Sequence, residues 1–412
     1  MTKRSLLTIP GPVLILCLTL PLFGQPLSFR SLGTAEGMRT LTSWHCTFDG
    51  FGHLWVSTSD GLLRYNGNEV SYYFTSTHPE LASDQTSFLF CDSKNNIWIP
   101  TSKGLTVADQ DRILKRLNIL PEEPDRPVNF CLEDSRGYIT AISEGKCFRQ
   151  TSPNLPWIPQ PWLDSLITGG RIRDIRRFDK ASYLFTIPNR GALLINLKAG
   201  KQVGFFPLKG IKHATRLDEN SIYMAQDGAF ALYKVFLQNP DSLIPMPLPS
   251  FLKKGDLKTE IQHLTLASNG KLYLATDGSG LLEYDILNKS YYQYKHDPAN
   301  LLSISEDALR YLISDSLGNI AFSSLSGVNY TNVRPKEVEY FNYFKTRSGK
   351  VYDERVISIA EDTIRQLWVV MEKAVLVMSP DRQDIRTLTY PASSSLDRAS
   401  LSLYYAAPDH HG

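Results

Sequence analysis

Residues 47–65 read TFDGFGHLWVSTSDGLLRY, and the rest of the chain repeats this pattern. The segment predicts three short strands joined by two tight turns. The first turn is DGFG (49–52) and the second is SDG (59–61), both rich in residues that tolerate turn backbones. Between them lies the β-prone run LWVST (54–58), with Trp55 in its middle. A meander this short cannot bury its apolar faces alone, so we expect it to pack against further copies of itself.

Seven more copies follow along the chain. Two of them, at 178–195 and 217–233, are blurred, because they lack both the tryptophan and the D-x-x-G turn. Neighbouring copies are 38–50 residues apart, and an all-β repeat of that length is typical of propeller blades. The residues taken as equivalent to the first tryptophan are Trp55, Trp98, Thr140, Phe185, Tyr223, Tyr273, Ala321 and Trp368.

An apolar strand precedes each later copy and would form the outermost, fourth strand of the blade before it. The copy at 27–33 has no blade before it, and it would complete the last blade of a ring, which removes two sheet edges. We therefore predict an all-β protein with a seven-bladed propeller of four-stranded blades over residues 25–335. Residues 336–412 would hold the first blade or blades of a second, truncated propeller. A single eight-bladed ring is the alternative. The other fourth strands are expected at 70–74, 112–120, 201–208, 290–294 and 338–344.

Residues 1–24 are predicted to be a signal peptide. Lys3 and Arg4 form a basic start, and an apolar run follows that Pro10-Gly11-Pro12 interrupts. The remaining apolar piece is short for a membrane span, so cleavage near Gly24 is favoured over a retained anchor. The mature chain is then expected to be exported to the periplasm.

Composition agrees with one large β assembly. Hydrophobic residues make up 42% and aromatic residues 11% of the 412 residues, which argues against disorder. The net charge is +2, with lysines and arginines scattered among acids, so nucleic-acid binding is not indicated.

The chain ends in the middle of a copy. Residues 401–412 read LSLYYAAPDHHG, which fits a first strand followed by the turn. We therefore expect this sequence to be a fragment of a longer repeat protein. His410 and His411 are interpreted as turn residues rather than as a metal pair.

Three cysteines occupy first-strand positions of their copies. These are Cys46, Cys91 and Cys131, and we expect them to be core thiols, with a disulfide after export as the alternative. The sequence has no C-x-x-C pair, so no cysteine metal site is expected.

The sequence offers no catalytic, metal or cofactor motif. It has no G-x-S-x-G, no H-E-x-x-H and no P-loop, and Asp277–Gly280 fits a hairpin loop. The repeated tryptophans are expected to pack between blades. Weak candidates for ligand contact are Trp157 and Trp162, in the loop NLPWIPQPWLD (154–164), because loops on a rigid scaffold often carry function. The alternative is that they cap the third blade.

The pattern D-x-x-G-x-[apolar]-W-[apolar]-x-T-x-x-G-L resembles the two-component regulator propeller repeat, most clearly at 49–65, 92–105 and 362–368. The resemblance spans residues 27–412 and is to the sensor region of hybrid two-component histidine kinases of Bacteroidetes. It implies two propellers outside the inner membrane, followed by a membrane segment and a kinase that this chain lacks. It also implies a small-molecule or oligosaccharide ligand and a homodimer in the full-length protein.

The function expected from these observations is a non-catalytic, periplasmic, glycan-responsive sensor region without its kinase output. The alternative is an exported propeller enzyme, such as a streptogramin-type or polysaccharide lyase, or else a protein-binding scaffold. An enzyme would need histidines and acids that converge on one face of the ring. The histidines on separate blades that could do so are His45, His213, His263 and His296.

Overall fold

The structure, a computed structural model, divides into two compact units, residues 1–334 and 335–412. It describes residues 27–34, 36, 38, 40, 42–152, 155–228, 230–298, 300, 302–334, 344–346, 348–352, 354–362, 364, 366–372, 374–380 and 384–388. The expected signal peptide, the turn at 409–412 and all but the last residue of the strand expected at 338–344 lie outside these residues. Each unit is described separately below.

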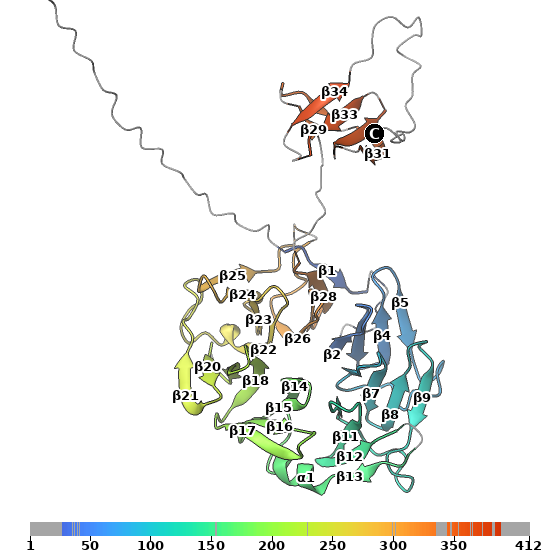
Figure 1. Cartoon of the computed structure of the whole chain (residues 1–412), viewed down its shortest axis with the longest axis vertical. Coiled ribbons are helices and arrows are strands. Elements are labelled where there is room, and N and C mark those ends of the chain that lie inside the picture. The colour runs from blue at the N-terminus through green and yellow to red at the C-terminus, as the bar shows by residue number, and fades with distance from the viewer. Residues whose placement is uncertain are drawn as a thin grey trace, which may run out of the picture. The chain divides into compact units, whose positions relative to one another are not determined.

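The described part of the first unit forms seven four-stranded antiparallel sheets, set around a common centre (Figure 1). The all-β propeller with four-stranded blades is therefore confirmed. The strands of each blade are given from the centre outward. Blade 1 contains β2 (Ser43–Phe48), β3 (Leu54–Thr58), β4 (Leu62–Tyr65) and β5 (Val70–Tyr73), and blade 2 contains β6 (Phe90–Cys91), β7 (Ile97–Thr101), β8 (Gly104–Ala108) and β9 (Leu114–Leu117). Blade 3 contains β10 (Phe130–Glu133), β11 (Ile139–Ser143), β12 (Lys146–Gln150) and β13 (Ile158–Pro159).

The remaining four blades follow the same plan, with two short helices added outside the sheets. The helices are α1 (Pro161–Ile167) and the 3-10 turn η1 (Leu257–Thr259). Blade 4 contains β14 (Asp174–Arg177), β15 (Ser182–Ile187), β16 (Gly191–Asn196) and β17 (Lys201–Phe206), and blade 5 contains β18 (Ile211–Arg216), β19 (Ser221–Gln226), β20 (Leu232–Phe236) and β21 (Asn239–Pro245). Blade 6 contains β22 (Ile261–Leu266), β23 (Leu272–Thr276), β24 (Leu281–Asp285) and β25 (Ser290–Tyr294). Blade 7 contains β26 (Leu309–Ser314), β27 (Asn319–Ser324), β28 (Gly327–Asn332) and β1 (Arg30–Leu32).

The first strand of the chain closes the ring, as the sequence predicted. β1 pairs with β28 in antiparallel register, with Arg30 opposite Tyr330 and Leu32 opposite Val328 (Figure 1). Phe29 and Leu32 are 1% and 2% exposed, so this edge strand is anchored by its apolar side chains as well as by its backbone. The pairing joins segments about 300 residues apart and leaves the last blade with a full set of four strands.

The repeated aspartate organises the hairpin at the inner end of each motif. In blade 2 the Oδ1 atom of Asp92 accepts hydrogen bonds from the amides of Lys94 and Asn96, both at 2.9 Å. Its Oδ2 atom accepts the indole N–H of Trp98 at 2.9 Å. The indole comes six residues after the aspartate. This bond therefore accounts for the fixed distance between the aspartate and the tryptophan in the repeat pattern.

The same arrangement recurs where the pattern is complete. Trp55 donates to Asp49 at 3.1 Å in blade 1, and Trp368 donates to Asp362 at 2.9 Å in the second unit. In blade 3 the tryptophan is replaced by Thr140, whose buried hydroxyl has no partner among the described residues.

Seven apolar clusters fill the seven junctions between neighbouring blades. Trp55 is fully buried between blades 1 and 2, and Trp98 is 6% exposed between blades 2 and 3. The predicted packing of these two tryptophans between blades is confirmed. Each blade thus buries its faces against copies of itself, which is what a meander of this size needs.

Two details of the sequence prediction are wrong. The residue equivalent to Trp55 in blade 4 is Leu184, which pairs with Arg176, and not Phe185. Phe178, not Asp179, occupies the turn position. Its amide donates a hydrogen bond to the carbonyl of Ser182, four residues later, and the turn aspartates of the other blades make the same bond. The Oδ1 atom of Asp179 instead accepts hydrogen bonds from the amides of Ala181 and Ser182 in the same turn.

The segment 154–164, predicted to be a loop, is the second correction, because it runs into β13 and α1. Pro161 stands at the start of the helix, where its fixed φ is favourable and its missing N–H costs nothing. Leu163 and Ile167 lie four residues apart and are buried on one face of the helix.

The second unit contains one more four-stranded sheet and a small hairpin. The sheet contains β31 (Val356–Glu361), β32 (Leu367–Met371), β33 (Val375–Met378) and β34 (Ile385–Leu388), and the hairpin contains β29 (Phe344–Lys345) and β30 (Val351–Tyr352). Val369, Met371 and Leu376 form the centre of its apolar cluster. One more blade-like sheet is therefore present in the described part of this unit.

The cysteines of the described chain are free thiols. Cys46 and Cys131 are buried, as expected for core thiols, whereas Cys91 is only partly buried. Burial raises the pKa of the Cys46 thiol to about 12. Within the described residues, no helix is long and apolar enough to cross a membrane.

Replacing Asp92 with alanine is expected to destabilise the first unit by about 3 kcal/mol, because two backbone amides, the side-chain amide of Asn96 and a buried indole N–H lose their acceptor. Urea unfolding followed by tryptophan fluorescence measures this change. Asp109→Ala is the matched control, since Asp109 caps an exposed outer turn with the same two-amide geometry but receives no indole. Equal losses in the two variants would show that the bonds from Trp98 and Asn96 to Asp92 Oδ2 contribute nothing.

Candidate functional site

One residue from each blade meets at the centre of the ring. In every copy this residue stands four positions before the turn position, near the start of the innermost strand. Ring-to-ring and polar contacts join six of the seven neighbouring pairs, for example His45 to Tyr311 at 4.1 Å and His213 to His263 at 3.9 Å between ring centres. We call this set the axial ring, and it consists of His45, Phe88, Phe130, Asp174, His213, His263 and Tyr311.

The polar half of the axial ring is organised by a buried ion pair. Arg176 donates from Nε to Asp174 Oδ2 at 3.0 Å, and a terminal nitrogen of the same guanidinium lies 2.7 Å from His263 Nε2. That group also donates to the carbonyl of Leu312 at 3.2 Å. His213 Nδ1 lies 3.2 Å from the same Asp174 oxygen.

The protonation states of these groups follow from their burial and from Arg176. Burial opposes ionisation of Asp174, but the Arg176 charge and hydrogen bonds from His213 and His263 outweigh it and hold the pKa well below its usual range. Burial lowers the pKa of His213, and it lowers that of His263 well below 6.5, where the charges of His213 and Arg176 add to the effect. The cluster therefore carries one carboxylate, one guanidinium and two neutral imidazoles at neutral pH.

The other half of the axial ring is aromatic. His45 packs between Phe88 and Tyr311, and its Nδ1 atom accepts the amide N–H of Leu89 at 3.1 Å. Burial and the nearby Arg176 charge lower the pKa of His45 to about 3. A neutral imidazole is also what this hydrogen bond requires, because Nδ1 must offer a lone pair.

A second ring lies one residue earlier in each copy, five positions before the turn. In blades 1, 5 and 6 the innermost strand has a register shift here, so that Trp44, Lys212 and Gln262 have no direct partner on the next strand. Bulges of this kind redirect a side chain out of the sheet. We call this set the mouth ring, and it consists of Trp44, Ser87, Asn129, Arg173, Lys212, Gln262 and Arg310.

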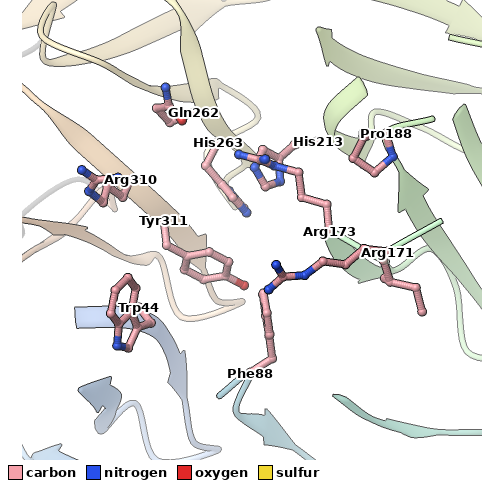
Figure 2. Close-up of a pocket in the computed structure, with 11 residues that line it drawn as sticks. Trp44, Phe88, Arg171, Arg173, Pro188, His213, Gln262, His263, Arg310 and Tyr311 are labelled. Atoms are coloured by element: carbon pink, nitrogen blue, oxygen red, sulfur yellow. The ribbon is translucent and has the colours of Figure 1, made fainter. Parts of the chain in front are cut away.

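A pocket of about 340 Å³ lies where the mouth ring surrounds the axial ring (Figure 2). His213, His263 and Tyr311 contribute to its lining from the axial ring, and Trp44 lies at its side with 57% of its surface exposed. Figure 2 shows Arg171 and Arg173 extending from one segment toward the middle of the pocket. The full lining is Trp44, Phe88, Arg171, Ile172, Arg173, Pro188, His213, Gln262, His263, Arg310 and Tyr311.

A neighbouring pocket of about 410 Å³ continues the same face. It shares Phe88, Arg171 and Ile172 with the first pocket and adds Ser87 and Asn129 from the mouth ring. A third pocket, of about 300 Å³, lies at the opposite ends of the innermost strands, where Thr47, Cys131 and Ser314 contribute. The first two pockets thus form one binding surface, and the axial ring separates it from the third.

The axial cluster has the residue types of a metal site but contains its own cation. Ligand atoms of Asp174, His213 and His263 lie within 4.8 Å of one another. The Arg176 guanidinium already hydrogen-bonds Asp174 and His263 there. A metal ion would have to displace that buried cation, so this donor set does not fit a resident metal.

The residues singled out from the sequence lie elsewhere or only partly meet. Trp157 is 8% exposed and packs edge-on against Trp98 at 6.4 Å between blades 2 and 3, while Trp162 lies half-buried on α1. Neither lines the three pockets described, and a ligand role for them stays a prediction. Of the four histidines, His45, His213 and His263 converge on the centre, whereas His296 lies on an outer loop against the carbonyl of Ile304.

Sequence reasoning missed Trp44, Arg171, Arg173, Asp174, Arg176, Gln262, Arg310 and Tyr311 as pocket or axial residues. A signal for most of them was present, because aligning the copies on the turn position places the axial ring at one column and the mouth ring at the column before it. Arg171 and Arg176 lie outside these columns and carry no repeat signal.

No known family profile matches the sequence, and no curated protein is significantly similar to it. The fold is similar to that of the extracellular domain assigned to the hybrid two-component system BT3049 of Bacteroides thetaiotaomicron, with a TM-score of 0.59 and 15% identity over 88% of this chain and 49% of that one. The corresponding domain of BT4673 from the same organism gives 0.58 and 14% over 88% and 53%. The propeller fold expected from the sequence resemblance is therefore confirmed, and the chain spans about half the length of these domains.

A propeller enzyme is also similar. A catalytically inactive histidine-to-alanine variant of virginiamycin B lyase from Staphylococcus aureus, with quinupristin, gives a TM-score of 0.54 and 12% identity, over 75% of this chain and all of that one. At these identities the likeness concerns the fold alone.

The unfolding free energy is expected to fall as the pH is lowered from 6.5 toward 3. In this window the unfolded chain protonates His45, with an ordinary pKa near 6.5, while the folded state keeps it neutral until about pH 3. Each such histidine contributes a slope of up to about 1.4 kcal/mol per pH unit. His213 and His263 act in the same direction, since their folded-state pKa is also lowered.

Urea titrations at several pH values measure this slope. The His45→Gln variant should lose one histidine's share of it, and His296→Gln, on an exposed loop, is the matched control. An unchanged slope in His45→Gln would contradict a neutral buried imidazole.

Proposed function

We propose that this chain is the non-catalytic ligand-sensing region of a periplasmic two-component signalling protein, and that it responds to a glycan. The fold likeness to extracellular domains of two-component systems supports this class of function. The observation that carries the proposal is the pocket at the mouth of the ring, with an exposed tryptophan beside it and the Asp174–Arg176 ion pair, bonded to two imidazoles, beneath it.

The exposed face of Trp44 suits a sugar ring. Its backbone belongs to the rigid innermost strand of blade 1, and its side chain leaves the sheet at the register shift. A large aromatic that is 57% exposed beside a pocket offers apolar area to the C–H face of a pyranose at little entropic cost. Gln262 adds an amide that can bond hydroxyl groups.

The paired state of the axial cluster favours binding over catalysis. Asp174 is held by Arg176 and the His213 imidazole, and Arg176 is held by a carboxylate, the His263 imidazole and a carbonyl. Groups satisfied in this way act as a rigid floor. A ligand that contacts several blades above this floor would then move the propeller as a rigid body. We propose that this movement is transmitted to a kinase.

The proposal extends to the parts of the protein around the ring. Residues 1–24 would direct export, residues 25–335 would form the sensing propeller, and residues 336–412 would begin a second one. A membrane segment, a kinase and homodimerisation would belong to the full-length protein. In this proposal the chain contacts no nucleic acid and needs no cofactor.

A thermal-shift screen of neutral and charged oligosaccharides tests the sensing role. A cognate glycan should raise the melting temperature, and Trp44→Ala should abolish the shift while folding normally. Phe51→Ala is the matched control, because Phe51 is an aromatic of the same blade that is 64% exposed and does not line the pocket. A shift that survives Trp44→Ala but disappears in Phe51→Ala would refute this site.

The second candidate is an exported lyase, and one pair of residues favours it. If His213 donates from Nδ1 to Asp174, its Nε2 atom is free to accept a proton from a substrate in the pocket. The likeness to virginiamycin B lyase supports the same class of chemistry.

Incubating the chain with each glycan that it binds, and with a streptogramin, separates the two candidates. For a sensor, mass spectrometry should recover every ligand unchanged. Cleavage that is lost in His213→Ala, while the ligand still raises the melting temperature, would instead assign an enzyme.

A further inference from the structure

The mouth of the ring carries an unusual charge pattern. Three arginines line the main pocket, and among the described residues that line it there is no acid. Arg171, Arg173 and Arg310 are all exposed, and none has an ion-pair partner in the part of the chain that the structure describes. The chain as a whole is close to neutral, with 44 basic and 42 acidic residues, so this gathering is local.

Other cations near the pocket are neutralised, which sets these three apart. Arg176 is paired with Asp174 at 3.0 Å. Lys212, the remaining cation of the mouth ring, is 3.0 Å from Glu260 and 3.8 Å from Asp227. Glu144, an acid in the lining of the neighbouring pocket, is 3.4 Å from Arg126, which is also 2.6 Å from Glu123. The three arginines therefore leave an excess of positive charge over the pocket.

The positions of the arginines suit a ligand that spans the mouth. Arg171 and Arg173 come from one segment before β14, and Arg171 lines both neighbouring pockets. Arg310 comes from β26, and Figure 2 shows it on the other side of the pocket, away from Arg171 and Arg173. Arg173 also lies close enough to His213 to disfavour its protonated form. Two walls of the pocket thus carry guanidinium groups, and Trp44 lines the same pocket from β2, in the blade next to that of β26.

From this arrangement we propose that the ligand of the mouth pocket is an anionic saccharide, bearing uronate carboxylates or sulfate esters. Guanidinium groups bind both anions through paired N–H donors, and partly desolvated pairs of this kind are strong. Trp44 supplies the apolar platform for the sugar ring, and the amides of Asn129 and Gln262 remain for its hydroxyls. The inference rests on the proposed sensing function and specifies its ligand.

Calorimetric titration of the whole chain with matched probes tests this proposal. Trigalacturonate carries carboxylates, galactotriose is its neutral counterpart, and neocarratetraose disulfate carries sulfate as its only anionic group. We expect at least one anionic probe to bind roughly tenfold or more tighter than galactotriose, since one charge-assisted hydrogen bond contributes about a factor of ten. The comparison of the two anionic probes then identifies which anion is preferred.

The variant R171Q/R173Q/R310Q should lose this preference, with binding of the anionic probe weakened roughly tenfold or more. The matched control is K115Q/K198Q/K201Q, which removes the same charge from exposed lysines on the outer part of the ring and should bind as the unmodified chain does. Equal binding of galactotriose and trigalacturonate, or an arginine variant that behaves like the lysine control, would overturn the anionic ligand and leave glycan sensing standing. Failure of both anionic probes to bind would also overturn it, and the separate neutral and charged screen then decides the sensing function.

Discussion

The pairing of β1 with β28 is the contact on which the ring depends. It joins the two ends of the first unit through backbone hydrogen bonds and the buried side chains of Phe29 and Leu32. Without it, blade 7 would keep three strands and an open edge, and the junction between blades 7 and 1 would lose Leu32 from its apolar cluster. The geometry of the axial ring follows from this closure, because its residues can meet only when all seven blades converge on one centre.

Closure also explains how an apolar repeat produces a polar centre. Each innermost strand contributes the same position to the axis, so seven unrelated residues are brought into contact by the repeat and not by their neighbours in the sequence. The buried charges of Asp174 and Arg176 tolerate this place because each has the other and further partners. Removing one of them would leave the other buried and uncompensated, which is costly. The axial ring is therefore a coupled unit in which one substitution affects several blades.

The sequence predicts the fold well because the turn aspartate and the tryptophan make one local bond. The spacing between Asp92 and Trp98 is set by that bond, so a short pattern identifies a whole blade. Where the bond is absent, the prediction loses register, as in blade 4, where Phe185 was taken as the equivalent of Trp55 in place of Leu184. The axial and mouth rings were missed for a different reason. Their residues are chemically unlike one another, so no motif marks them, and only their common distance from the turn connects them. Arg171 could not have been found in this way, since it stands outside both columns.

The same architecture separates what stabilises the ring from what can recognise a ligand. Successive residues of a strand point to opposite sides, and the register shifts at Trp44, Lys212 and Gln262 direct these side chains to the mouth, while the next residue in each case is buried at the axis. Apart from Lys212, which is buried and paired with Glu260, the mouth-ring side chains are at least partly exposed, so their substitution costs little stability. Substitutions one position later disturb the buried cluster. A ligand that binds above the axial ring meets side chains that differ in every blade, held by a scaffold that repeats. The arginines on opposite walls of the pocket belong to different blades, so an anion that binds arginines on both walls would link those blades directly. Binding of a charged ligand would in this way make the whole ring more rigid.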